Sequence, residues 1–289
     1  MSNLGKLGIW AMQFRGGDRA EVRDAAAELA GYGYSTLWLP GLSGGAALHD
    51  VRDLLAAAPD IVASIGVLAI WGQPPVQVAQ ALARLDADYG PRTMLGLGIS
   101  SPESAREAGE TYGHPIPTMS RYLDGLAQAG RPVPADRVLL GALGPKMARL
   151  AAERTRGFHP FLVTPEYSAR MRQQLGTAPW IAPHLAVVLD RDAARARTIA
   201  RQGVGMAFGM PTYRANLTRL GFTEGDCVDG GSDRLIDAVV AHGDLGAVAD
   251  HIRKHLDAGA DHVAVQILHG RGGLPRSEWK ELASVLPSL

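Results

Sequence analysis

Short apolar runs alternate with amphipathic segments along most of this chain. Eight of the runs have the length and the continuous apolar character of strands that are buried on both faces of a parallel sheet. They lie at residues 7–11, 35–39, 61–70, 93–99, 138–143, 158–163, 181–189 and 262–268. Pro160 weakens the first half of the sixth run, because proline has no N–H to donate to a strand ladder.

Helices are predicted between these strands, where apolar residues recur at a spacing of three or four. The helix at 244–259 shows the pattern: Asp244 is a good N-cap, Val248 and Ile252 fall on one side, and Gly259 ends the segment. The predicted helices cover residues 19–31, 48–58, 76–88, 120–129, 145–155, 166–175, 192–202, 211–220, 232–241, 244–259 and 279–286.

Eight strands that alternate with helices, without a second core, predict an α/β fold of the (β/α)8 TIM-barrel type. We expect one domain over residues 1–289. The alternation breaks at about 203–243, where two helices and an acidic loop stand between the seventh and eighth strands. This helical insertion is expected to form a lid or a partner surface.

Two turns after predicted strands suit the binding of an anion. In Gly144-Pro145-Lys146, glycine frees the backbone and proline begins a helix, so the helix N–H groups point outward. A lysine is disfavoured at the positive end of a helix, which an anionic ligand would explain; a solvated lysine is the alternative. Thr164-Pro165-Glu166 starts the next helix in the same way. Neighbouring parallel strands would bring both turns together as a phosphate cup.

Two further residues attract attention near the strand ends. Gly98, with a second glycine in the fourth strand, allows a ligand or another backbone to approach closely, and tight packing of a helix is the alternative. His159 lies well before the end of the sixth predicted strand, and we expect a buried structural role for it.

Composition excludes several classes of protein. The chain has 29 basic and 29 acidic residues in 289, and this zero net charge argues against nucleic acid or an anionic membrane as the main partner. The single Cys227 excludes an internal disulfide framework and suits a reducing cytosol. No signal segment or long apolar run is present, so a cytoplasmic protein is expected. His251 and His255 share a helix face but lack the HExxH glutamate, so no metal site is expected.

Four stretches of the chain resemble the bacterial-luciferase-like family, and most closely its deazaflavin (coenzyme F420)-dependent oxidoreductase branch. They are LGALGPKMARLAAERTRGFHPFLVTPEY, APHLAVVLDRDAARARTIAR, YRANLTRLGF and HGDLGAVADHIRKHLDAGADHVAVQIL. The resemblance extends from Leu7 to Leu268 and includes the insertion. It implies a TIM barrel that forms dimers or larger homo-oligomers and holds a flavin or deazaflavin in the barrel mouth. Hydride transfer between the cofactor and a small organic substrate is the implied reaction.

The resemblance also suggests the residues that contact the cofactor. Leu143 stands where some relatives have glycine, and Gly144, Pro145 and Lys146 follow it in what resembles the phosphate turn. Thr164 matches a phosphate-binding position after the sixth strand.

A second segment resembles the wall behind the cofactor ring. The residues are Leu68, Ala69, Ile70 and Trp71, where relatives often carry a bulged non-proline cis peptide. Many close relatives have asparagine at the position of Ala69.

The catalytic positions depart from the family pattern. Relatives often have His or Glu at the end of the second strand and Glu after the fourth, where this chain has Pro40-Gly41 and Ser100-Ser101. The sequence therefore assigns no catalytic residue. Water, the two serines, or a residue of the insertion such as Tyr213 are the remaining proton sources, which favours substrates such as conjugated enones that need little acid from the enzyme.

The sequence thus predicts an F420-dependent oxidoreductase. An FMN-dependent luciferase-like monooxygenase is the alternative with another cofactor. A barrel that binds a phosphorylated ligand without catalysis is the alternative from another class, because the acid and base positions are missing.

Overall fold

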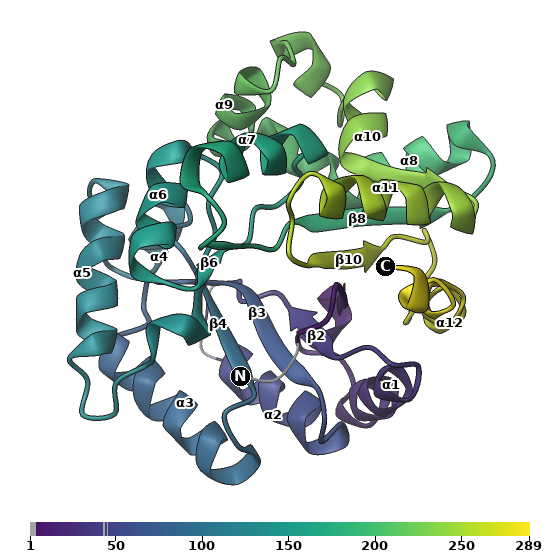
Figure 1. The fold of residues 1–289 in the computed structure, drawn as a ribbon. Helices are drawn as coiled ribbons and strands as arrows, with labels where there is room; N and C mark the ends of the chain where they lie inside the picture. The colour runs from purple at the N-terminus through teal and green to yellow at the C-terminus, as the bar shows by residue number, and fades with distance from the viewer. Residues whose placement is uncertain (1–3, 43, 45) are drawn as a thin grey trace.

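The computed structural model describes residues 4–42, 44 and 46–289. Its centre is a curled sheet of ten parallel strands, surrounded by helices (Figure 1). The strands are β1 (Leu7–Trp10), β2 (Thr36–Leu39), β3 (Val62–Ala69), β4 (Thr93–Gly98), β5 (Val138–Leu140), β6 (Gly157–Phe158), β7 (Trp180–Ile181), β8 (His184–Leu189), β9 (Val240–Gly243) and β10 (Val263–Ile267). The predicted α/β class is confirmed.

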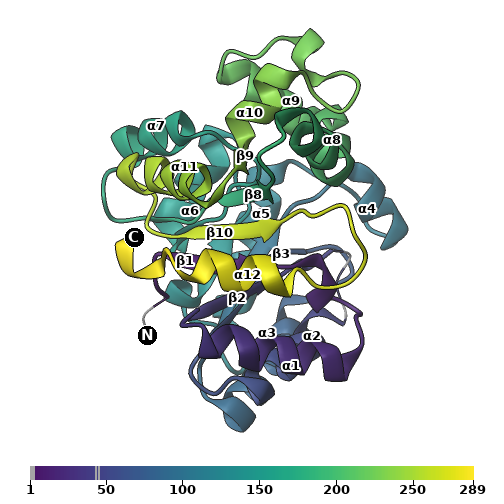
Figure 2. The same cartoon turned by 90° about the vertical axis from the view of Figure 1, so that its right-hand side faces the viewer.

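The helices mostly follow the strands one by one. They are α1 (Arg19–Gly31), α2 (Ala47–Ala57), α3 (Pro75–Tyr89), α4 (Pro102–Glu107), α5 (Pro115–Ala127), α6 (Pro145–Arg154), α7 (Pro165–Leu175), α8 (Ala193–Val204), α9 (Pro211–Arg219), α10 (Asp233–Val239), α11 (Leu245–Asp257) and α12 (Arg276–Ala283). Figures 1 and 2 both show α8, α9 and α10 grouped at one side of the molecule. No helix formed by the described residues has the apolar run that a bilayer span requires.

The strand order is β7-β6-β5-β4-β3-β2-β1-β10-β8-β9. Strands β7 and β8 are parts of one stretch, broken at Ala182 and Pro183. On one side of this stretch the Ala182 N–H donates to Phe158 O (3.0 Å), and on the other the Asp261 N–H donates to Ile181 O (2.8 Å). The stretch is thereby bonded to the β6 side and to the β10 side, so the sheet curls back on itself.

Side chains on the two faces of the strands enter different apolar clusters. Leu37 and Leu39 belong to the large cluster beneath the helices, whereas Trp38 between them belongs to a smaller cluster with Trp10, Met94 and Leu139. This alternation is what a pleated strand requires when both faces are buried. Trp38 also donates through Nε1 to His262 Nε2 at 3.0 Å.

Two predicted elements need correction, and one helix was not predicted. The sixth predicted strand, 158–163, is reduced to β6 and an isolated bridge between Phe161 and His184, because Pro160 has no N–H to donate. The predicted helix 232–241 ends at Val239, and the next four residues form β9 beside β8. A short helix that was not predicted, α4, begins where Ser101 accepts a hydrogen bond from the Ser104 N–H (3.3 Å).

Candidate functional site

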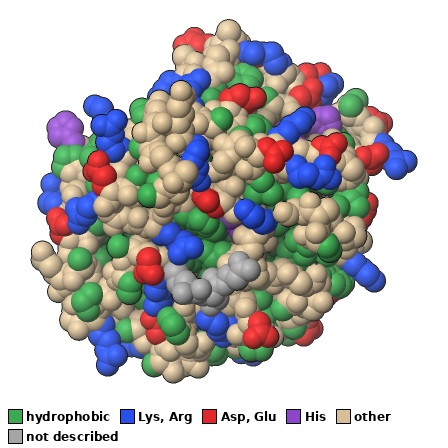
Figure 3. Space-filling view, in the orientation of Figure 1, with side chains coloured by type: hydrophobic (Ala, Val, Ile, Leu, Met, Phe, Trp, Pro, Cys, Tyr) green, Lys and Arg blue, Asp and Glu red, His purple; other side chains and the backbone are tan. Residues whose placement is uncertain are grey.

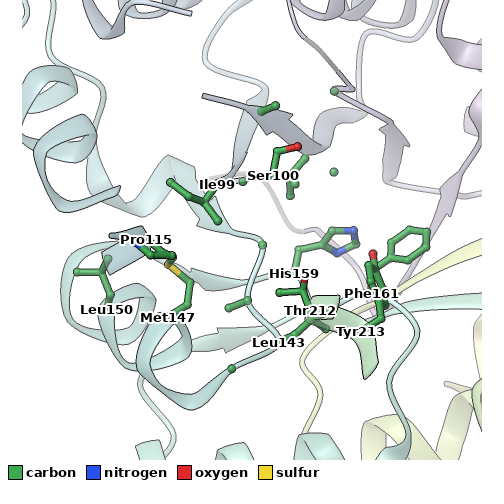
Figure 4. A pocket seen from close by; sticks show the side chains of 18 of the residues that line it. Ile99, Ser100, Pro115, Leu143, Met147, Leu150, His159, Phe161, Thr212 and Tyr213 are labelled. Carbon is green, nitrogen blue, oxygen red and sulfur yellow. The ribbon is translucent and has the colours of Figure 1, made fainter. Parts of the chain in front are cut away.

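A cavity of about 1600 Å³ opens at the carboxyl ends of the strands. Its inner walls come from the ends of β1 to β6, and its outer walls come from α6 and from the first residues of α5 and α9. Figure 4 shows side chains from these segments converging on one space. In parallel α/β proteins the carboxyl end of the sheet is where ligands bind. Figure 2 shows that β10 points away from the side on which the N-terminus lies, so Figure 3, which has the N-terminus toward the viewer, shows the face opposite the cavity. Side chains of both charges are spread over that face among hydrophobic ones.

Most of the predicted cofactor residues line this cavity. These are Ala69, Gly98, Leu143, Gly144, Pro145 and Lys146. The structure therefore brings the glycine of β4, the end of β3 and the turn before α6 to one site.

The other three predicted residues lie outside the cavity lining. Ile70 and Trp71 are buried, and Trp71 donates through Nε1 to Ile99 O at 2.6 Å. Thr164 is also buried, at the N-cap of α7, where its side chain accepts no capping hydrogen bond. The turns at Gly144 and Thr164 do not form a shared cup on this cavity.

The floor of the cavity is formed by a bulge in β3. The register between β3 and β4 shifts between Ile65 and Leu68, and the peptide bond between Gly66 and Val67 is cis. The resemblance placed this feature within 68–71, whereas the structure has it just before that segment. Gly66 and Val67 line the cavity beside Ala69.

Gly98 is explained by packing inside the protein. A Cβ atom at Gly98 would lie 2.7 Å from Val67 Cγ2, and one at Gly141 would lie 3.2 Å from the same atom. Two glycines on neighbouring strands thus make room for one side chain of the bulge. The atom nearest to a Cβ at Gly98 belongs to a side chain of strand β3 and not to a helix, so the helix packing considered as the alternative is not what the structure shows.

The turn before α6 presents the features expected of an anion site. Gly144 is the N-cap, with φ of −91°, and the nearest atom to a Cβ placed on it would be Arg219 Nη2 at 3.9 Å. The side chain of Lys146 is exposed on the first turn of α6. Arg219, the last residue of α9, donates to Leu143 O at 3.4 Å. Two cations therefore flank the amino end of α6.

Arg219 was missed by the sequence analysis. It is 76 residues from Leu143 along the chain, and only the packing of α9 beside α6 brings them together. The motif YRANLTRLGF contributed to the family resemblance, but nothing in it indicates which turn the arginine reaches.

His159 lies buried at the inner end of the cavity, and its predicted burial is confirmed. Its Nδ1 is 2.6 Å from Ala182 O, so Nδ1 carries the proton and donates. The ring stacks on Trp38, with centroids 4.5 Å apart. Burial lowers the pKa of His159 to about 4, so the ring is neutral at physiological pH. Its Nε2 has no hydrogen-bond partner among the described residues.

Tyr213 brings a phenol to the cavity from the first turn of α9. Its ring makes an edge contact with Phe161, with centroids 6.5 Å apart. Desolvation by the surrounding walls raises the pKa of Tyr213 to about 12, so the hydroxyl keeps its proton at neutral pH.

Packing explains why the position after β2, where relatives often have His or Glu, has no such side chain here. A Cβ atom at Gly41 would lie 2.3 Å from Leu68 Cα, so the structure has no room for a side chain there. After β4, Ser100 has φ of +54° and its Oγ is 2.9 Å from Ser104 Oγ.

Among the described residues, no group of three or more His, Cys, Asp or Glu is arranged to hold a metal ion.

Solved structures of several enzymes share this fold. An F420-dependent secondary alcohol dehydrogenase, in complex with an F420-acetone adduct, is 14% identical; the match covers 100% of this chain and 99% of that chain, with a TM-score of 0.75. A coenzyme F420-dependent tetrahydromethanopterin reductase from Methanopyrus kandleri is 16% identical over 98% of both chains, with a TM-score of 0.71. The oxygenating constituent of 3,6-diketocamphane monooxygenase from Pseudomonas putida, in complex with FMN, is 14% identical over 98% of this chain and 97% of that chain, with a TM-score of 0.69.

These likenesses show the fold and confirm that the structural neighbours are those that the resemblance implied. No protein-family model matches the chain, and no curated protein sequence matches it.

Proposed function

We propose that this chain is a luciferase-like oxidoreductase that binds F420 in the cavity and exchanges a hydride with an organic substrate. In this proposal the whole of 1–289 is one (β/α)8 domain, with the segment at about 203–243 as its insertion. The observation that carries the proposal is the amino end of α6, which opens into the cavity between Lys146 and Arg219. The shared fold with two F420-dependent enzymes supports it.

The residues present fit the chemistry of this cofactor. A phosphate suits the free N–H groups of the first turn of α6, because Gly144 leaves the approach open and two cations are nearby. A planar ring suits the apolar floor at Gly66 and Val67. When bound, the deazaflavin would supply the hydride chemistry, and the protein would supply binding, orientation and exclusion of water.

The remaining groups have assignable tasks. Phe161, Leu143 and Met147 provide apolar walls that exclude water from the reacting atoms. Tyr213 holds its proton at neutral pH and presents a hydroxyl that can donate a hydrogen bond to a carbonyl oxygen. His159 offers no proton at Nε2, because its proton lies on Nδ1 and is donated to Ala182 O.

The test is a titration of the purified protein with F420 and FMN side by side. We expect a lower dissociation constant for F420 than for FMN, and a melting temperature that rises with F420 concentration. Tighter binding of FMN would favour the monooxygenase alternative, which the FMN-bound neighbour also supports. Binding without turnover of alcohols, ketones or enones would favour a non-catalytic barrel that binds a phosphorylated ligand.

Assembly and location are part of the same proposal. We propose a homodimer or larger homo-oligomer in the cytoplasm, with a small-molecule substrate and with neither nucleic acid nor membrane as partner. Light scattering of the purified protein at micromolar concentration tests the assembly, and a mass equal to one chain would contradict it.

A further inference from the structure

We propose that the substrates are bulky, uncharged, largely apolar carbonyl compounds of polycyclic size, bound in an arm of the cavity between α5 and α6. This inference rests on the proposed function. We define the apolar arm by the residues Ile99, Tyr112, Pro115, Ile116, Met147 and Leu150, all of which line the cavity. In Figure 4, Pro115, Met147 and Leu150 lie together at one end of the site, apart from His159, Phe161 and Tyr213 at the other.

The arm exists because of how α6 faces its neighbours. Lys146, Leu150 and Glu153 follow one another at helical spacing, and all three line the cavity, so one side of α6 forms a wall along its length. The first turn of α5 forms the facing wall with Pro115 and Ile116. The cavity therefore continues outward along the helix instead of ending at the strands.

The chemistry of the walls selects the occupant. Met147 and Leu150 are each 8% exposed, whereas Lys146 and Glu153, on the same wall, are exposed. A charged group placed against the apolar residues would lose its water without gaining a partner. Each CH₂ group buried there would strengthen binding about fourfold. The arm thus favours a large hydrocarbon frame.

The size of the cavity supports a second molecule beside the cofactor. Pockets for a single drug-sized ligand usually measure about 300–1,000 Å³, and this cavity measures about 1600 Å³. The cofactor turn at Gly144 and the wall at Leu150 are on the same helix, so a substrate in the arm lies next to the proposed cofactor.

The experiment compares two enones that have the same reactive group and different size. Both 2-cyclohexen-1-one and a tetracyclic steroid enone gain a hydride at the β-carbon from reduced F420 and a proton at the α-carbon from solvent. The ketone product is reduced by two electrons and F420 is oxidised by two. We expect kcat/KM to be at least tenfold higher for the steroid. An equal or lower value for the steroid would overturn the proposal.

A variant that narrows the apolar arm tests whether the preference for the steroid arises there. In Leu150→Phe we expect the steroid-to-cyclohexenone ratio of kcat/KM to fall at least fivefold. Val228→Phe adds the same ring at an exposed position outside the cavity, and its ratio should match that of the parent protein. Melting temperatures show whether the variants fold; if Leu150→Phe does not, Ile116→Phe provides the same narrowing from α5.

Two binding measurements separate this proposal from the cofactor assignment. Calorimetry without cofactor should show steroid binding that Leu150→Phe weakens at least fivefold, and absence of such binding would contradict the apolar arm even if F420 turns over. If F420 fails to bind while the steroid binds in this manner, the proposed function is wrong and the arm stands. If Leu150→Phe weakens F420 as strongly as the steroid, the arm holds the cofactor's own tail and the substrate proposal is wrong.

Discussion

His255 is a fully buried side chain on α11, at 0% exposure, and neither ring nitrogen has a hydrogen-bond partner among the described residues. Burial lowers the pKa of His255 to about 3, against an ordinary value near 6.5. Between these two values the unfolded chain binds a proton that the folded chain does not. Stability is therefore complete above about pH 6.5 and falls as the pH drops toward 3.

We predict that the parent protein loses stability steeply as the pH falls, and that the His255→Leu variant loses it less steeply. His159, His251 and His262 act in the same direction, because burial lowers the pKa of each to about 4. The free energy of unfolding, measured from pH 8 to pH 4.5, should depend less on pH in His255→Leu, by up to about 1.4 kcal/mol per pH unit. The same slope in His255→Leu as in the parent would contradict this account. Exposed His49→Leu is the control.

Gly144 tests whether a ligand approaches the turn before α6. Its φ of −91° suits any residue, and a Cβ would meet little of the protein, so a larger residue would not strain this turn. Gly144→Ala should keep its melting temperature but bind F420 about tenfold more weakly, because the methyl group would lie where the phosphate must approach. Gly130→Ala, also in open space, is the control, and equal affinities in the two variants would remove the turn from the site.

At the scale of elements, α9 brings two residues of the predicted insertion to the site. It contributes Tyr213 at its start and Arg219 at its end. We predict that Arg219→Gln weakens F420 binding about five- to tenfold and reduces the dependence of binding on salt, because one cation near the phosphate is lost. Arg121→Gln, on the exposed face of α5, should change neither quantity. Titrations of both variants with F420 at two salt concentrations test this prediction. An unchanged salt dependence of binding in Arg219→Gln would exclude a contact between Arg219 and the phosphate.

The elements that could be predicted from the sequence are those with local signals. The helix predicted at 19–31 has the same bounds as α1, because Asp18 caps it and its apolar residues fall on one side. The first two residues of β9 were predicted as helix, since Val239 and Val240 fit either pattern and only pairing with β8 decides between them.

The same division holds for the candidate site. The turn at Gly144 can be predicted from its local residue types. Other features of the site depend on residues that are distant in sequence. Val67 fills the space above Gly98, and Arg219 reaches Leu143. Short-range patterns carry no information about such pairs, so they could not be predicted.

At the scale of the whole molecule, Arg172 ties the two sides of the curled sheet together. Its guanidinium donates to Gly259 O at 2.6 Å and to Asp261 Oδ2 at 2.7 Å, and the same carboxylate oxygen accepts the Ile181 N–H at 2.8 Å. Helix α7, strand β7 and the start of β10 meet at this one side chain.

We predict that Arg172→Ala lowers the free energy of unfolding by about 2–3 kcal/mol, because several hydrogen bonds to a charged group are lost at a partly buried position. Arg52→Ala removes an exposed pair with Asp88 and should cost about 0–1 kcal/mol. Denaturant titrations of both variants provide the comparison. Similar losses in the two would show that Arg172 does not hold the sheet together.

The pairing of β1 with β10 has a consequence for how the protein is made. Strand β1 is translated long before its partner, Val263–Ile267, which lies far along the chain. Until that partner is made, one edge of β1 has unpaired backbone groups beside an apolar surface, which is the kind of edge that other nascent chains can add to. We therefore expect Leu7–Trp10 to be a segment that chaperones must shield during synthesis.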